Sequence, residues 1–219
     1  MRDVLRLNVG DTVEVFDDGG QAAKATLASV DAGSVTLHVQ ELIEQPARSG
    51  IEITIASAVP KGDRADWMIE KLSELGVARF IPLVTERSVV HPTGKSKSDR
   101  WTRLAIESAK QSHRTGVMQI DPLTPMADVL KTATTAWFMS TQGAATPITM
   151  LLRSPSGPTT LMVFVGPEGG WADEEITHFN AVGAIGVALT PTILRIETAA
   201  VATAAVLGCW SIPAQQCGD

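Results

Sequence analysis

The chain has 219 residues, of which 44% are hydrophobic and 19% are charged, and its formal net charge at pH 7 is −6. This composition is typical of a globular protein that buries a substantial core, and the length suits one large domain or two unequal ones. Two cysteines and four scattered histidines exclude a disulfide framework and a zinc cluster, so we expect no metal.

Positive charge is concentrated in one part of the chain. The overall net charge argues against a nucleic-acid-binding protein, whose surface should be basic. Residues 61–114, however, contain 11 of the 18 Lys and Arg residues and 7 of the 24 acidic residues, which gives this segment a local charge of +4. The segment is either a nucleic-acid contact region or an ordinary solvated face, and composition leaves both interpretations open.

The first 49 residues predict a small β domain, because they lack helical periodicity and contain strong turn signals such as Asp17-Asp18-Gly19-Gly20. We expect short strands at residues 13–16, 22–30 and 34–40, arranged as a small β-barrel or a meander. A polar segment with Pro46 and Gly50 follows. We place the domain boundary there, which divides the chain into residues 1–49 and 50–219.

From residue 50 onward, strand-like and helix-like segments alternate. Strands are expected at residues 51–58, 80–84, 136–139, 161–165 and 187–189. Helices are expected from residue 62 to Gly76, from Ser98 and Asp99 onward, from Asp173 onward, and over residues 198–210. This alternation predicts an α/β fold with a mostly parallel sheet.

The last predicted helix, residues 198–210, is small and apolar on every side. Such a helix must be buried, either in the core or against another chain. It is also too short to span a bilayer, and no signal peptide opens the chain. We therefore expect a cytoplasmic protein with no membrane partner.

Three turns of similar design follow predicted strands. The apolar run 161–165 leads into Gly166, Gly169 and Gly170, which let a ligand approach the backbone closely. Two further turns, residues 140–143 and 190–196, follow neighbouring strands. Because ligands gather at the carboxyl ends of parallel strands, the three turns are able to enclose one nucleoside-sized ligand. The alternative is that the glycine turn is merely a tight connection.

Two of these turns carry a recognisable signature. Gly166-Pro167-Glu168-Gly169-Gly170, followed by the segment LTPTILRIETA at residues 189–199, closely resembles the paired motif of the RsmE family, the 16S rRNA uridine-N3 methyltransferases of the SPOUT class. Further blocks of the resemblance, in the family's order, are residues 61–77, 82–90 and 106–112.

The resemblance implies a fold, a cofactor and partners. It implies a SPOUT-type knotted α/β domain with a C-terminal trefoil knot, a PUA-like RNA-binding barrel in residues 1–49, and a homodimer formed through the knot region. The barrel is expected to be short at its start, since relatives carry another strand before the segment that matches residues 4–7. The implied cofactor is S-adenosyl-L-methionine (SAM), held by Met139, Ser140, Thr141, Gly166, Pro167, Glu168, Gly169, Gly170, Leu189, Ile193, Leu194, Thr198 and Ala199.

The chemistry of uridine-N3 methylation suggests two catalytic residues. Loss of the N3 proton spreads negative charge onto the flanking carbonyl oxygens, which a fixed guanidinium stabilises. From its place in the motif we assign this role to Arg195, the alternative being a structural arginine that bonds turn carbonyls. Glu197 either orients Arg195, helps to remove the proton, or caps the following helix. Thr192 stands where many relatives have arginine.

Contacts with 16S rRNA in the small ribosomal subunit are expected from Arg2, Arg6, Lys61, Arg64, Arg87 and Arg114, which would bind phosphates. Trp67 and Trp101 are interpreted as core residues rather than RNA-stacking residues, because of their helical spacing. Two alternatives remain: another SPOUT RNA methyltransferase, acting on tRNA or a ribose 2′-hydroxyl, and a noncatalytic RNA-binding protein of the same fold. Nucleotide hydrolysis is disfavoured, since no Gly-Lys-Ser/Thr follows the glycine turn.

Overall fold

The computed structural model describes residues 7–17, 21–31, 33–43, 50–92, 94–114, 116–142, 144–153 and 157–210. The chain forms two compact units. The first comprises Met1–Arg48 and His113–Val117, and the second comprises Ser49–Ser112 and Met118–Asp219. Arg2 and Arg6, two of the expected RNA contacts, lie outside the described residues.

The first unit contains a three-stranded antiparallel sheet in the order β1-β2-β3. Its strands are β1 (Thr12–Phe16), β2 (Ala22–Val30) and β3 (Val35–Ile43). The central strand β2 supplies the buried side chains Ala22, Ala23, Ala25 and Leu27. All three predicted strands are confirmed, and β3 continues beyond the predicted end because its residues 41–43 pair with residues 22–24 of β2.

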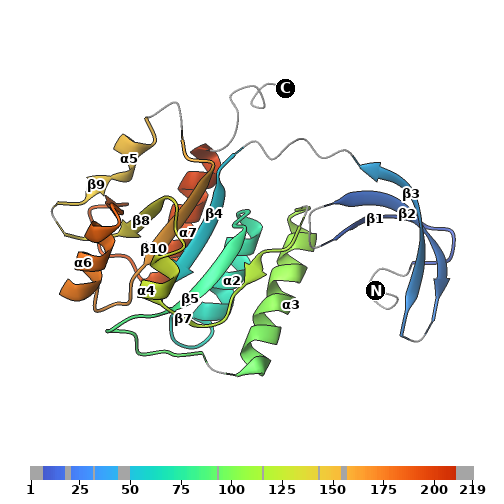
Figure 1. Ribbon diagram of the computed structural model, residues 1–219. Coiled ribbons are helices and arrows are strands. Elements are labelled where there is room, and N and C mark those ends of the chain that lie inside the picture. The colour runs from blue at the N-terminus through green and yellow to red at the C-terminus, as the bar shows by residue number, and fades with distance from the viewer. Residues whose placement is uncertain are drawn as a thin grey trace. The chain divides into compact units, whose positions relative to one another are not determined.

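The second unit is built on a parallel sheet in the order β6-β5-β4-β10-β8-β11-β9, with β7 paired to β5 (Figure 1). Its strands are β4 (Glu52–Ser57), β5 (Arg79–Val84), β6 (Gln119–Ile120), β7 (Thr124–Pro125), β8 (Ala136–Met139), β9 (Thr146–Pro147), β10 (Thr160–Val165) and β11 (Ile185–Ala188). The strand β10 lies between β4 and β8, with Leu161, Val163, Phe164 and Val165 buried. The predictions of a parallel sheet and of a central strand buried on both faces are therefore confirmed.

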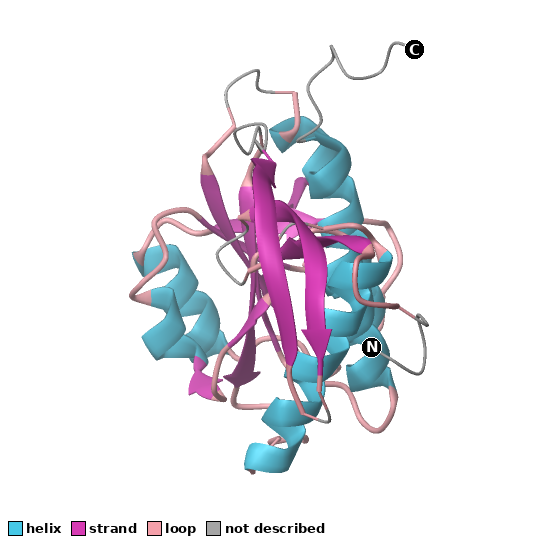
Figure 2. Cartoon of the chain, turned by 90° about the vertical axis from the view of Figure 1, so that its right-hand side faces the viewer, coloured by secondary structure: helices cyan, strands magenta, loops and turns pink. Residues whose placement is uncertain are grey.

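Helices cover the sheet on both sides (Figure 2). They are α2 (Arg64–Glu74), α3 (Lys95–Gln111), α4 (Met126–Leu130), α5 (Ile148–Leu151), α6 (Asp173–Ala181) and α7 (Ile196–Trp210). The helix α2 contacts α3 and α7, whereas α4 contacts α6. Beside α6, the rings of Phe138 and Phe179 stack with centroids 4.4 Å apart, and Phe164 meets Phe179 edge-on. This aromatic cluster supports the end of the sheet that carries the glycine turn.

Two predicted helix starts are wrong. The helix α3 begins at Lys95 rather than at Ser98. The prediction missed its first residues, Lys95-Ser96-Lys97, because they are polar and carry no apolar periodicity. The helix α7 begins at Ile196, and the N–H of Ala199 donates to the oxygen of Arg195 as its first helical bond. Glu197 and Thr198 therefore lie inside the first turn, and neither caps the helix.

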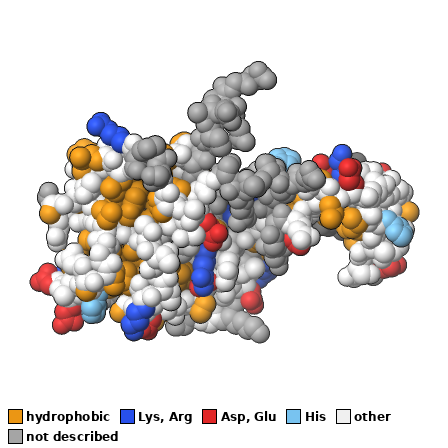
Figure 3. All heavy atoms as spheres, turned by 45° about the horizontal axis from the view of Figure 1, so that its top comes forward, with side chains coloured by type: hydrophobic (Ala, Val, Ile, Leu, Met, Phe, Trp, Pro, Cys, Tyr) orange, Lys and Arg blue, Asp and Glu red, His pale blue; other side chains and the backbone are white. Residues whose placement is uncertain are grey.

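The tryptophans of the second unit divide between core and surface. Trp101 is buried against Phe80, as predicted, with the two rings meeting edge-on at 5.9 Å. Trp67 is 45% exposed on α2, so its interpretation as a core residue is wrong. Apolar side chains also gather in patches on the surface of the second unit (Figure 3). Met150 is among the exposed apolar residues of this unit. Within the described residues, no helix is long and apolar enough to cross a membrane.

Candidate active site

A pocket with a volume of about 300 Å³ lies at the carboxyl ends of β8, β10 and β11. The three predicted turns meet there, as expected for neighbouring parallel strands. All residues predicted to hold the cofactor line this pocket except Thr198, whose side chain is exposed on the first turn of α7. The volume is at the lower end of the range for small-ligand sites.

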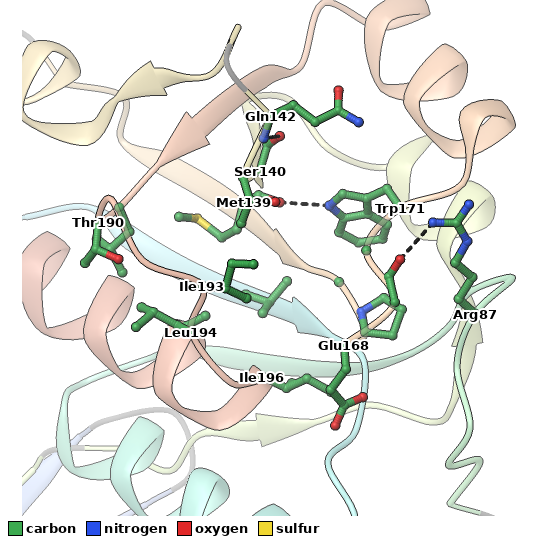
Figure 4. Close-up of a pocket in the computed structure, with 18 of the residues that line it drawn as sticks. Arg87, Met139, Ser140, Gln142, Glu168, Trp171, Thr190, Ile193, Leu194 and Ile196 are labelled. Carbon is green, nitrogen blue, oxygen red and sulfur yellow. Dashed lines mark hydrogen bonds between the residues drawn. The ribbon is translucent and has the colours of Figure 1, made fainter.

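The glycine turn, residues 166–170, has a shape that only glycine permits at two positions. A Cβ atom on Gly166 would lie 2.9 Å from Cε2 of Trp171, so the indole ring occupies the space of a side chain. Gly170 has a φ of +71°, in the left-handed region that favours glycine. The indole Nε1–H of Trp171 donates to the backbone oxygen of Met139 over 2.9 Å (Figure 4). The glycine turn is therefore joined to the end of β8.

The turn after β11 forms the opposite wall of the pocket. A hydrogen bond within the turn stabilises it: Thr190 Oγ1 donates to the backbone oxygen of Thr192 over 2.9 Å. Ile193 and Leu194 present apolar side chains from this wall, and Met139 of β8 lies above them in the close-up view (Figure 4). Ile193 is 83% exposed, so its side chain is open to contact with a ligand. Apolar walls of this kind suit the flat base of a nucleoside.

A third wall comes from the end of β5. Arg87, predicted as an RNA contact, lines the pocket, and its Nη1–H donates to the backbone oxygen of Gly169 over 2.8 Å. Behind it, the buried carboxylate of Glu175 accepts hydrogen bonds from the N–H groups of Glu86 and Ala172. Sequence reasoning missed Glu175, although its place three residues after the helix N-cap was a signal for one of these bonds.

The two predicted catalytic residues do not line the pocket. Arg195 is exposed and follows the lining residue Leu194. Glu197 is buried, and its Oε1 lies 3.3 Å from Nη1 of Arg64. No hydrogen-bond partner for Oε2 of Glu197 occurs among the described residues. Glu197 is thus paired with Arg64, one of the predicted RNA contacts.

The remaining predicted RNA contacts that the structure describes belong to different units. Lys61 is exposed just before α2, in the second unit. Arg114 is half-buried and belongs to the first unit. In the part of the chain that the structure describes, no group of three or more His, Cys, Asp or Glu residues is placed to hold a metal ion.

Comparison with known proteins identifies the family. The family model described as an RNA methyltransferase domain matches residues 47–208, and the model described as an RNA methyltransferase PUA domain matches residues 1–40. The ribosomal RNA small subunit methyltransferase E of Bacillus subtilis is 36% identical over 207 residues, covering 90% of this chain and 80% of the relative. The chain belongs to the RsmE family of RNA methyltransferases. The resemblance inferred from the two turn motifs is therefore confirmed.

Solved RsmE-family structures have the same fold. The ribosomal RNA small subunit methyltransferase E of Neisseria gonorrhoeae, bound to S-adenosyl methionine, superposes with a TM-score of 0.82 at 29% identity, covering 95% of this chain and 86% of that chain. A Legionella pneumophila methyltransferase in complex with SAM gives a TM-score of 0.82 at 26% identity, with the same coverage. The predicted α/β methyltransferase fold with an N-terminal PUA domain is thus confirmed.

The pocket of this RsmE-family chain fits an adenosine-containing cofactor. Ile193 and Leu194 line it with apolar side chains that suit a base, and the glycine turn borders it with backbone groups. A Cβ atom on Gly170 would meet nothing within 4 Å, so the backbone there borders open space. Arg87 adds a positive charge and Glu168 a negative charge to the lining. These groups complement the carboxylate and the cationic groups of SAM.

Proposed function

We propose that this protein methylates N3 of a specific uridine in 16S rRNA of the small ribosomal subunit, with SAM as the methyl donor. One observation carries the proposal: in a chain of the RsmE family, the turns after β8, β10 and β11 enclose a single pocket of nucleoside size. SAM supplies a methyl group on a sulfonium, which a nucleophile removes by in-line displacement. The task of the protein is to hold donor and base in that line.

The three turns hold the donor in this proposal. Backbone groups of residues 139–141 and 166–170 bind the ribose and the methionine portion, and Leu189, Ile193 and Leu194 cover the adenine. Ala199 closes the pocket from α7, where it lines the wall. Thr198, the residue before Ala199, has an exposed side chain. A contact between Thr198 and SAM therefore requires the donor to extend toward the start of α7.

Arg195 and Glu197 remain the proposed catalytic residues. The guanidinium of Arg195 stabilises the negative charge that develops on the uracil carbonyl oxygens as N3 loses its proton. Its side chain is exposed, and in the sequence it stands between the lining residues Leu194 and Ile196. Glu197 is buried beside Ile196 and retains one oxygen without a partner among the described residues, which suits an acceptor for the proton or for a guanidinium.

The RNA is held by cations of both units in this proposal. Lys61, Arg64 and Arg87 of the second unit bind phosphates, as do Arg2, Arg6 and Arg114 of the first. Residues 1–49 act as the RNA-binding domain and residues 50–219 as the methyltransferase domain. Trp67, exposed one helical turn after Arg64, is available to stack on a base. The target uridine leaves its stack to reach the donor.

We further propose a homodimer formed through a C-terminal trefoil knot, active in the cytoplasm, where ribosomal subunits are assembled. The half-buried side of α7 supports the dimer. The buried residues of α7 pack against α2 and β4, whereas four apolar residues are only half-buried, namely Val201, Ala202, Ala205 and Val206. A second copy of the chain would remove this apolar surface from water.

The proposal is tested by incubating the full chain with labelled SAM and hypomethylated small subunits, and by locating the label with mass spectrometry. Label on N3 of one 16S rRNA uridine is the expected result. Label on tRNA or on a ribose 2′-hydroxyl would assign the chain to another RNA methylation. Tight SAM binding in calorimetry without any transfer would indicate a noncatalytic RNA-binding protein.

A further inference from the structure

A hydrogen-bonded network joins the end of β5 to the glycine turn. The turn after β5, residues 85–88, is closed on itself: Thr85 Oγ1 lies 2.7 Å from Ser88 Oγ, and the N–H of Ser88 donates to the oxygen of Thr85 over 3.2 Å. We call this segment the β5 turn. From it, the side chain of Arg87 reaches the backbone oxygen of Gly169, 2.8 Å away. The β5 turn therefore holds one carbonyl of the glycine turn directly.

Glu175 makes a second link, between the β5 turn and Ala172, which lies two residues after the glycine turn. Its side chain is buried, with the residue only 7% exposed. Oε2 accepts from the N–H of Ala172 over 2.8 Å, and Oε1 accepts from the N–H of Glu86 over 3.0 Å. A carboxylate that serves two backbone donors on separate segments fixes the distance between them.

Capping of α6 explains only one of these bonds. A glutamate three residues after the N-cap commonly accepts from the N-cap backbone, which is the bond from Ala172. Glu86 lies 89 residues earlier in the chain and has no part in starting α6. The bond from Glu86 therefore joins the β5 turn to the first turn of α6, where Glu175 precedes the pocket-lining residue Ile176.

We propose that Glu175 and Arg87 are positioning residues for methyl transfer, which hold the glycine turn in the conformation that forms the cofactor pocket. This inference rests on the proposed function and adds two residues to its machinery. Arg87 packs against Gly169 as well, because a Cβ atom there would lie 3.3 Å from Cβ and Cδ of Arg87. Arg87 thus holds the glycine turn by a hydrogen bond and by packing, and the Glu175 carboxylate holds Ala172, two residues after that turn.

The network also places RNA relative to the donor. Arg87 uses one Nη1–H group on Gly169, and its exposed guanidinium has four further N–H donors at the pocket wall. A phosphate bound by those donors would lie at a set distance from the turn that holds SAM. Arg87 would then contact both the RNA substrate and the turn that binds the cofactor.

The test is calorimetric titration of SAM into the full chain, with three variants. Glu175→Gln keeps the size of the side chain but replaces one acceptor oxygen with an amide donor, so we expect the SAM Kd to rise about tenfold. Arg87→Met keeps the packing on Gly169 but removes the hydrogen bond, and we expect a rise of about fivefold. Both changes loosen the same turn. The rise in SAM Kd of the double variant should therefore be well below about fiftyfold, the product expected if the two effects were independent.

Matched controls lie on the same elements or in the same unit. Glu174→Gln changes the exposed neighbour of Glu175 on α6, and Arg153→Met changes an exposed arginine that does not line the pocket. Both should leave the SAM Kd within about twofold of wild type. In the transfer assay, saturating SAM should restore the rate of Glu175→Gln, whereas Arg87→Met should keep a raised KM for the small subunit.

Each outcome has a defined meaning. An unchanged SAM Kd in both single variants, with a lowered unfolding temperature in Glu175→Gln, would assign these residues a merely structural role and overturn the inference. If Glu175→Gln does not fold, the exposed Arg87→Met substitution still decides the question. A wild-type chain that binds no SAM would instead refute the proposed function.

Discussion

The indole nitrogen of Trp171 and the backbone oxygen of Met139 are 2.9 Å apart and joined by a hydrogen bond. This bond connects the turn after β10 to the end of β8, two segments that are neighbours in the sheet and distant in sequence. The same indole ring packs edge-on against Phe179 of α6, with centroids 4.9 Å apart. Trp171 therefore links the pocket walls to the aromatic core beneath them.

Replacing Trp171 with phenylalanine tests the contribution of this hydrogen bond to the pocket. The substitution keeps an aromatic ring against Phe179 but leaves the oxygen of Met139 without its donor. We expect the SAM Kd, measured by calorimetry, to rise about fivefold to tenfold. Trp67→Phe is the control, because Trp67 is exposed on α2 and away from the pocket lining. Equal SAM affinity in the two variants would show that the bond to Met139 does not shape the pocket.

Gly166→Ala tests the close approach between the glycine turn and Trp171. The added Cβ atom would lie 2.9 Å from Cε2 of the indole ring, so either the ring or the turn must shift. We expect SAM binding to weaken by at least about tenfold and the free energy of unfolding to fall by about 1–3 kcal/mol. In Gly208→Ala, the nearest contact is the Leu75 oxygen at 3.8 Å, and this change within α7 should be neutral or stabilising. A Gly166→Ala protein that binds SAM normally would contradict the role assigned to this contact.

The sequence predicts the larger elements of the second unit because their signals are local. The run at residues 161–165 is apolar without interruption, and the structure places it between two parallel strands. Short elements such as β6, β7 and β9 have two residues each, which is too few for a periodic pattern. Their pairing with β5 and β11 is a property of the tertiary fold.

The candidate site was partly predictable for a similar reason. Turns that follow neighbouring parallel strands meet at one edge of the sheet, so the convergence of three turns followed from their order. The direction of a single side chain does not follow from that order. Arg195 lies in the predicted turn yet is exposed beside the pocket, whereas Arg87 of the β5 turn lines it. The role of Glu175 depends on a contact with Glu86 that no local pattern contains.

Removal of Arg64 should destabilise the fold through Glu197. The Glu197 side chain is 7% exposed, and its closest cation is Arg64, with N and O atoms 3.3 Å apart. Arg64→Met would leave a buried carboxylate without its partner. Since the Arg64 side chain is 39% exposed, we expect a loss of about 1–2 kcal/mol in the free energy of unfolding measured with urea, below the loss for a fully buried pair.

Two further variants separate this effect from general damage. Lys131→Met breaks an exposed pair with Asp128 and should change the free energy of unfolding by less than about 0.5 kcal/mol. Adding Glu197→Gln to Arg64→Met removes the buried charge, so part of the lost stability should return. No recovery in the double variant would mean that Arg64 stabilises the protein by packing rather than through the charge of Glu197.

Arg195→Gln tests the proposed catalytic guanidinium. The side chain does not line the cofactor pocket, so the SAM Kd measured by calorimetry should remain within about twofold of wild type. Because a fixed cation acts on charge that develops during the reaction, we expect methyl transfer to small subunits at saturating SAM to fall about 100-fold. Arg103→Gln, on the exposed side of α3, is the matched control and should transfer methyl groups at the wild-type rate. Full activity in Arg195→Gln would show that Arg195 does not stabilise the charge on the uracil oxygens. Arg87, the arginine that lines the pocket in the described part of the chain, would then be the candidate for this role.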